Sequence, residues 1–267
     1  MEGRTLTGKF VKSVEVVPEK GIGIDDLRNA SGLLSGVVDM ATVPENPMGR
    51  PGIDPVSALL EITRGTSIEP VPHITPRDKN SLYIRSQILT AIKFGIRRFF
   101  VIGGDRISPQ VQSKEVRELD VFQTIDLIKS TAAGTGEEVE VGSAFNPYRE
   151  NESKFAMKKM DSGSSFFITQ VLTSAEPLIN GGFTRENAFL IAGFMPMKRR
   201  SSVSMLEKMG VRIKGTRFER IADSEDPLGE STRVILETVD EIRGLISGVH
   251  IMPMGDYDTA TKILECI

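Results

Sequence analysis

Four side chains that can exchange protons or form directed hydrogen bonds end or follow segments predicted as buried β-strands. They are Glu15, His73, Asp105 and Gln170. The apolar run Phe99–Ile102 is the clearest of these segments, because it has no polar alternation and is therefore expected to be buried on both faces. Two carboxyl groups, an imidazole and an amide suit proton donation beside a flat, hydrogen-bonding ligand. We therefore take these positions as a candidate site.

Each position also has a purely structural interpretation. Glu15 could be a solvated residue of an edge strand, but a glutamate in a central strand is costly to bury without a purpose, which favours function. Asp105 could end an ordinary Gly-Gly-Asp turn. His73, between two prolines, could be a hydrogen-bonded loop residue, and Gln170 could cap a strand end. Only the fold decides whether the four side chains meet.

The rest of the chain alternates between predicted strands and helices from end to end. The predicted strands are 10–17, 36–41, 68–72, 99–102, 139–144, 165–169, 188–192 and 248–252, and helices are predicted near 25–34, 54–63, 79–94, 121–128, 151–161, 174–179, 201–208, 232–246 and 260–267. Asp54 is a candidate N-cap, with Pro55 at the first helical position. Eight strands, each followed by a helix, predict an α/β fold, a (β/α)8 TIM barrel in a single domain over residues 1–267.

A doubly wound open sheet is the competing architecture. It would need a glycine-rich phosphate turn after the first strand, and Pro18–Gly23 does not have the pattern Gly-x-Gly-x-x-Gly. In a barrel, the carboxyl ends of the strands meet in one mouth where ligands bind. The residues expected there are Glu15, Thr42, His73, Asp105, Ala144, Phe145, Asn146, Gln170, Met195 and Met252.

Composition excludes several classes of function. The net charge of −3 and the pI near 5.6 argue against a nucleic-acid-binding surface. The single cysteine, Cys266, allows no intrachain disulfide and no cysteine-based metal site, and we expect no bound metal and a cytoplasmic location. No apolar run reaches the ~20 residues of a membrane span, and the first residues lack the apolar segment of a signal peptide.

Five motifs in order resemble those of the methylenetetrahydrofolate reductase family. Ser13-Val-Glu-Val-Val-Pro18 resembles S-F-E-F-F-P of its first strand, and Pro72-His-Ile-Thr-Pro-Arg-Asp-Lys-Asn80 resembles P-H-L-T-C-R-D-x-N. Gly95–Asp105 resembles G-I-x-x-x-L-x-L-x-G-D. Ser143–Pro147 resembles A-A-F-N-P, and Lys158–Gln170 resembles K-K-x-D-A-G-A-D-F-x-I-T-Q. The motifs run through almost the whole chain, and their common order is the strong part of the resemblance.

The resemblance implies a flavoprotein of one-carbon metabolism and methionine biosynthesis. It would reduce 5,10-methylenetetrahydrofolate to 5-methyltetrahydrofolate, with hydride passing from NADH or NADPH through bound FAD. Glu15 would match the acid that opens the folate's five-membered ring, Asp105 would lie between flavin and pterin, and Gln170 would contact folate and nicotinamide in turn. Flavin-contacting positions would be Thr42, His73, Gly104, Asp105, Ala144, Phe145, Lys158 and Lys159, although two adjacent lysines are otherwise typical of a solvated helix face.

The chain departs from the family pattern beside Asp105. Gly103 stands where the family has an arginine, and Arg106 follows where prolines are usual. Open alternatives are a flavin-free reductase, a tetrahydromethanopterin substrate, a catalytic subunit of a larger electron-transfer complex, and a folate-binding barrel without catalysis. A homo-oligomer or a partner electron-transfer subunit is compatible with the sequence. The small-molecule substrate is common to the enzyme alternatives.

Overall fold

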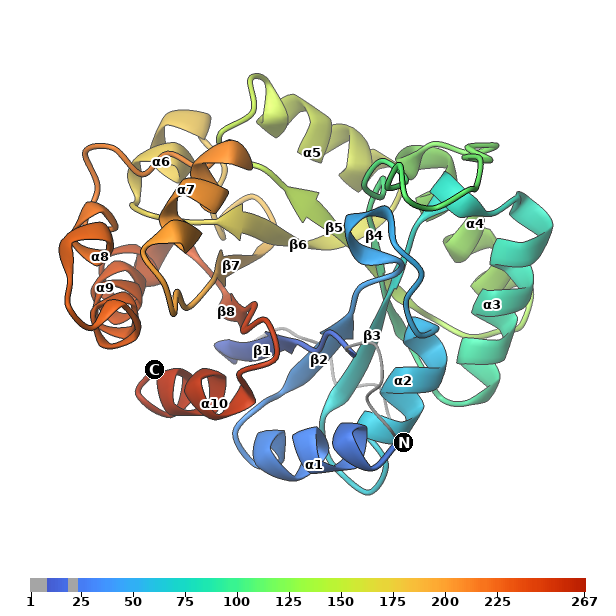
Figure 1. Cartoon of the computed structure of the whole chain (residues 1–267). Coiled ribbons are helices and arrows are strands. Elements are labelled where there is room, and N and C mark those ends of the chain that lie inside the picture. The colour runs from blue at the N-terminus through green and yellow to red at the C-terminus, as the bar shows by residue number, and fades with distance from the viewer. Residues whose placement is uncertain (1–8, 19–23) are drawn as a thin grey trace.

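The computed structural model describes residues 9–18 and 24–267, which form a closed barrel of parallel strands in the order β1 to β8, surrounded by helices (Figure 1). The described strands are β1 Val11–Glu15, β2 Met40–Val43, β3 Glu69–Ile74, β4 Arg98–Val101, β5 Glu140–Phe145, β6 Ser164–Val171, β7 Phe189–Phe194 and β8 Gly248–Ile251. Strand β1 pairs with β2 on one side and with β8 on the other, which closes the barrel. The predicted TIM barrel is confirmed.

Helices follow the strands as the sequence predicts, with small shifts at their ends. The helices are α1 Ile24–Leu34, α2 Pro55–Ile62, α3 Ser81–Lys93, α4 Val121–Ala133, α5 Glu152–Asp161, α6 Glu176–Gly181, α7 Ser201–Lys208, α8 Glu219–Asp223, α9 Pro227–Ile242 and α10 Tyr257–Glu265, with 3-10 turns η1 Pro47–Gly49, η2 Pro76–Asp78 and η3 Arg243–Leu245. Asp54 caps α2 as predicted, because its carboxylate accepts a 2.8 Å hydrogen bond from the N–H of Ser57.

Two predicted element boundaries are wrong, and one helix was missed. The second strand begins at Met40 rather than at Gly36, because Gly36 has a left-handed φ of 84° and belongs to the turn after α1. The helix predicted over 232–246 starts earlier, at Pro227, and its last turn tightens into η3. The short helix α8 was not predicted. The expectation about the first residues rests on positions 1–8, and the argument from the turn after the first strand rests mostly on positions 19–23; both lie outside the described ranges.

The core has an inner and an outer part. Inside the barrel, bulky side chains from alternate strand positions pack together; these are Val11, Met40, Val71, Phe100, Phe166, Ile168 and Ile191. The opposite faces of the strands pack against the helices in two larger clusters. The inner space is filled by side chains, so no pore runs through the described part of the barrel, and a ligand is expected at its mouth.

No helix in the described part of the chain is long and apolar enough to cross a membrane.

Gly142 is a point where the inner packing depends on the absence of a side chain. A Cβ atom at Gly142 would lie 2.2 Å from the ring of Phe166, which is only 1% exposed and has no room to move. Gly32, in contrast, lies exposed in α1, and a Cβ atom added there would have no neighbour within 4 Å. These two glycines form a matched pair for testing the barrel interior.

We expect Gly142→Ala to lower the free energy of unfolding by about 1–3 kcal/mol, the usual range for overpacking in a core. Gly32→Ala should leave it unchanged or raise it by up to about 1 kcal/mol, because alanine is the better helix former. Urea unfolding followed by circular dichroism measures both changes. Equal stability of the two variants would contradict the described packing inside the barrel.

Candidate active site

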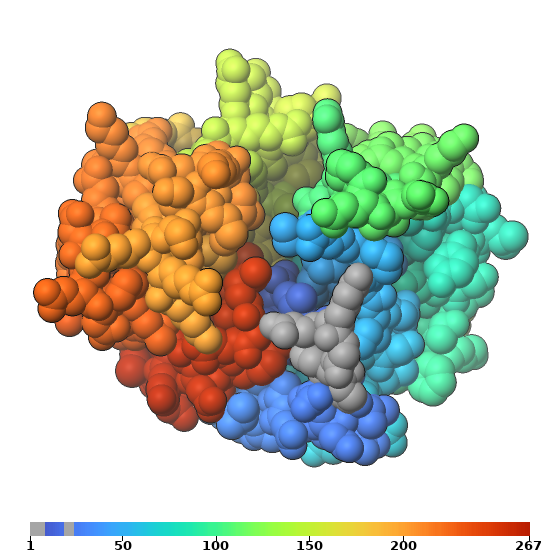
Figure 2. Space-filling model, in the orientation of Figure 1, coloured from blue at the N-terminus to red at the C-terminus, as the bar shows by residue number. Residues whose placement is uncertain are grey.

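The four candidate residues lie at one end of the barrel. Glu15 is the last residue of β1, His73 is the penultimate residue of β3, Gln170 is the penultimate residue of β6, and Asp105 lies in the loop after β4. Because all strands are parallel, these positions belong to the carboxyl-terminal mouth. Figure 2 shows a hollow at the centre of the face that carries the β2–α2 and β4–α4 loops. The barrel therefore brings together the residues that the sequence distributes over 156 positions from Glu15 to Gln170, counted inclusively.

Glu15 is held in a form suited to proton donation. Removal of its carboxyl group from water, with a smaller contribution from the negative charge of Asp105, raises the pKa of Glu15 from 4.5 to about 7. The residue as a whole is half-buried and ends its strand at the mouth. A carboxylic acid that keeps its proton near neutral pH and can be reached by a ligand has the properties of a general acid.

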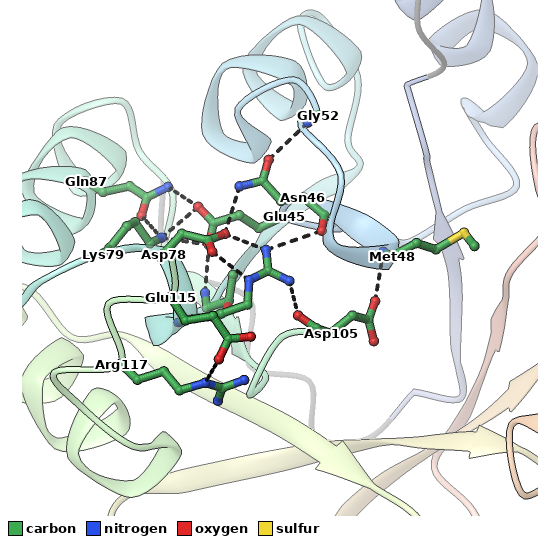
Figure 3. Close-up of polar contacts among 12 residues, drawn as sticks. Glu45, Asn46, Met48, Gly52, Asp78, Lys79, Gln87, Asp105, Glu115 and Arg117 are labelled. Carbon is green, nitrogen blue, oxygen red and sulfur yellow. Dashed lines mark hydrogen bonds and ion pairs between the residues drawn. The ribbon is translucent and has the colours of Figure 1, made fainter. Parts of the chain in front are cut away.

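Asp105 is held by two neighbouring loops. Its Oδ2 accepts a 2.8 Å hydrogen bond from the main-chain N–H of Met48, and its carbonyl oxygen accepts one from the guanidinium of Arg77 (Figure 3). The preceding residue, Gly104, has a φ of 76°, and a Cβ there would lie 2.5 Å from Oγ1 of Thr75. Glycine is therefore required for the turn that brings Asp105 to the mouth.

Gln170 occupies an irregular point of the sheet. The pairing of β6 with β7 shifts register between Ile168 and Val171, and such bulges redirect side chains near active sites. Its Oε1 accepts a 2.9 Å hydrogen bond from the N–H of Val171. Its amide nitrogen has no partner within residues 9–18 and 24–267, so it remains a donor for a ligand.

Thr42 and His73 carry buried polar atoms without a partner. Oγ1 of Thr42 and both ring nitrogens of His73 make no hydrogen bond within the described residues. Burial, with a contribution from His250, lowers the pKa of His73 to about 3, so its ring is neutral. Buried polar atoms are rarely left unpaired, and the exceptions in a mouth point to a ligand or to ordered water.

The remaining candidates differ in how their side chains are placed. Ala144 packs at the inner core, whereas the side chain of Phe145 points outward, with its ring centroid 4.6 Å from that of Phe183. Only the main chain of Phe145 can face a ligand in the mouth. Nζ of Lys159 donates a 2.6 Å hydrogen bond to the carbonyl oxygen of Ala144, while Lys158 is exposed. Met195, expected at the mouth, instead packs in the outer core, which corrects that prediction.

The sequence did not predict several buried polar residues whose contacts lie beneath or beside the mouth. His250 is buried on β8, where its Nδ1 lies 2.8 Å from the hydroxyl of Ser13. Arg77 is 1% exposed, and Nζ of Lys79 forms a buried ion pair with Glu45. Arg77 and Lys79 are both within a recognised motif, but their partners come from distant loops that no local pattern reveals.

The described residues contain no group of three or more His, Cys, Asp or Glu side chains that could hold a metal ion.

The model of a protein family described as methylenetetrahydrofolate reductase matches residues 4–267. The chain belongs to the methylenetetrahydrofolate reductase family. No curated protein sequence matches the chain significantly.

Solved structures similar to this family member show the same fold at low sequence identity. One is an uncharacterised protein from Clostridium thermocellum that binds two copies of 5-methyl-5,6,7,8-tetrahydrofolic acid; its TM-score is 0.69 at 14% identity, covering 97% of this chain and 96% of that one. Another is 2,3-dimethylmalate lyase, with a TM-score of 0.51 at 12% identity, covering 96% of this chain and 80% of that one.

The raised pKa of Glu15 has a consequence for stability. Between pH 4.5 and about 7 the folded protein keeps the Glu15 proton that the unfolded chain loses, so this contribution to stability is full below pH 4.5 and is lost as pH rises through 7. Glu15→Gln does not titrate. We expect the variant to gain up to about 3 kcal/mol relative to the wild type between about pH 4 and about pH 8.

Urea unfolding of both proteins across this pH range measures the difference. A stability difference between wild type and Glu15→Gln that stays constant with pH would show that the pKa of Glu15 is not raised.

Proposed function

We propose that this protein reduces 5,10-methylenetetrahydrofolate to 5-methyltetrahydrofolate, with hydride supplied by NADH or NADPH through bound FAD. The observation that carries the proposal is the placement of Glu15, with its raised pKa, beside Asp105 in the mouth of a barrel of this family. The Clostridium thermocellum protein that binds 5-methyltetrahydrofolic acid has the same fold over nearly its whole length, which supports a reduced folate as the ligand.

The reaction needs a proton donor before hydride can be accepted. The methylene carbon of the substrate is bridged between two nitrogens, and protonation of one nitrogen opens the five-membered ring to a reactive iminium. Glu15 is positioned to give this proton, because its pKa near 7 leaves a large fraction protonated at neutral pH. Its position at the end of β1, on a rigid strand, keeps the acid in place while the ligand changes.

Asp105 and Gln170 are the groups that orient the ring system. The carboxylate of Asp105 accepts hydrogen bonds and matches the N–H groups of a pterin ring, and its fixed negative charge also keeps Glu15 protonated. The amide of Gln170 offers both donor and acceptor atoms. It can therefore contact a carboxamide, such as that of nicotinamide, as well as a pterin.

The residues of the mouth fit a flat, polar cofactor such as FAD. The unpaired atoms of Thr42 and His73 are acceptors or donors for the edge of an isoalloxazine ring, and the main chain at Gly104, Ala144 and Phe145 adds further polar groups. Lys158 is an exposed cation suited to a phosphate, while Lys159 supports the main chain of Ala144. When bound, FAD supplies hydride transfer between nicotinamide and folate.

The function of Glu15 predicts a selective defect. Glu15→Gln should slow reduction of methylenetetrahydrofolate by about 10²–10⁴-fold, because only this half of the reaction needs an acid. Oxidation of the nicotinamide with an artificial electron acceptor should continue at nearly the wild-type rate. Rapid-mixing kinetics of the two halves separates these outcomes, and equal damage to both would show that Glu15 has a structural role only.

The visible absorption spectrum tests the cofactor. We expect the purified protein to bind FAD, and to lose part of it on dilution because Gly103 supplies no side chain where the family has an arginine. Added FAD should then restore activity. A colourless preparation that turns over at full rate, without response to added FAD, would replace this proposal with direct hydride transfer from nicotinamide to the pterin.

A further inference from the structure

The β2–α2 loop contacts the segment after β4 that carries Asp105. The N–H of Met48 donates to the Asp105 carboxylate at 2.8 Å (Figure 3). The carbonyl oxygen of Gly49 accepts a 2.9 Å hydrogen bond from the N–H of Ser108. The Asp105 side chain is therefore oriented by a main-chain donor from another loop. The donor is a neutral N–H, whereas the positive charge that acts on Asp105, that of Arg77, is hydrogen-bonded to the carbonyl oxygen and not to the carboxylate.

Arg77 fixes this arrangement from beneath. Its buried guanidinium donates to the carbonyl oxygens of Asp105 and Asn46 and to the carboxylate of Asp78. Its own carbonyl oxygen accepts hydrogen bonds from the N–H groups of Val116, at 2.7 Å, and of the next residue. A planar group with five N–H donors can serve three loops at once, which a lysine cannot do.

The loop is also held in a backbone conformation that few residues adopt. Asn46 and Met48 have left-handed φ values of 45° and 55°, and Gly49 follows with 65°. A Cβ at Gly49 would lie 2.0 Å from the carbonyl oxygen of Arg106. Non-glycine residues in this region persist only where the surroundings enforce it, and such strain is found at functional sites. Gly49 is therefore the point of closest contact between the two loops.

We infer that Arg77 and Gly49 are positioning residues that clamp the Asp105 carboxylate in the mouth beside Glu15, through the main chain of Met48. The role of this arrangement in catalysis rests on the proposed function, whereas the positioning of the Asp105 carboxylate by Arg77 and Gly49 does not. In the described residues, Asp105 is the charged group that acts on Glu15. The imidazoles of His73 and His250 beneath the mouth are neutral, because burial lowers the pKa of each to about 3.

Two glycines of the same loop provide the test. Gly49→Ala must push the loop away from Arg106, whereas a Cβ at Gly52 would make an ordinary 3.4 Å contact with Pro47 at a φ that other residues adopt. In protein labelled with ¹³C at Asp and Glu carboxyl carbons, NMR titration reports Asp105 and Glu15 directly, with Asp105→Asn and Glu15→Gln for assignment.

We expect Gly49→Ala to change the chemical shift of the Asp105 carboxyl and to move the titration of Glu15 to lower pH, because the freed carboxylate acts less on Glu15. Gly52→Ala should leave both signals as in the wild type. In the reductase assay, Gly49→Ala should lower kcat by about 10²-fold with a smaller change in KM, since reacting groups misplaced by about 1 Å lose rate on this scale.

The inference is overturned if folded Gly49→Ala titrates like the wild type, or if Gly52→Ala shifts the two signals equally. If Gly49→Ala does not fold, Asn46→Gly is tested in its place, and the inference again requires a changed Asp105 signal and a lower titration midpoint of Glu15. This variant keeps the left-handed backbone and removes the side-chain bonds to Asp78 and Gly52. Absence of reductase activity in the wild type would instead contradict the proposed function. The NMR titration would still test whether Gly49 positions the Asp105 carboxylate.

Discussion

The mouth of this barrel depends on a carboxyl group that is withdrawn from water at the end of a strand and faces a second carboxylate. Within the described residues, no cation offsets the burial of Glu15, which therefore keeps its proton to about pH 7. The neighbouring imidazoles do not relieve it, because they are buried and neutral. The structure therefore keeps a protonated carboxyl group at the end of β1, within reach of the charge of Asp105 from the loop after β4.

Two loops hold Asp105 in the position from which its charge acts on Glu15. The carboxylate receives a main-chain N–H from the β2–α2 loop, and the cation nearest in the network, Arg77, is directed to the Asp105 carbonyl oxygen and to Asp78. A guanidinium paired directly with the Asp105 carboxylate would weaken its effect on Glu15. The loops thus hold the carboxylate in a fixed position while Arg77, whose charge also acts on Asp105, hydrogen-bonds its carbonyl oxygen rather than its carboxylate; a fixed charge of this kind is what electrostatic preorganisation requires.

Much of this arrangement could be predicted from the sequence. The buried run Phe99–Ile102 and the alternation of apolar and polar residues in the first strand predict β-strands. In a parallel barrel, the carboxyl ends of these strands lie at the same mouth. The order of five motifs led to the family that the comparison with its model shows. Side-chain direction was harder to predict, since Ala144 and Phe145 are adjacent and only alternation at a known register sends one inward and the other outward.

The supporting network could not be predicted, for a physical reason. Arg77 joins groups that lie 28 to 31 positions away in the chain, and its contacts exist only after three loops have converged. The left-handed conformation of Met48 likewise follows from contacts between loops, because methionine rarely adopts it, whereas Asn46 belongs to a residue type that tolerates it. The conformation of such loops depends on contacts with distant residues, whereas strands and helices can be predicted from the spacing of apolar residues in their own sequence.

A crystal structure of the protein with 5-methyltetrahydrofolate tests the central claim most directly, because it shows where a reduced pterin lies relative to Glu15, Asp105 and Gln170. The account predicts the pterin ring in the mouth, within hydrogen-bond distance of the Asp105 carboxylate and the Gln170 amide, with its reacting edge toward Glu15. A pterin bound away from the carboxyl ends of the strands, with Glu15 and Asp105 untouched, would contradict it.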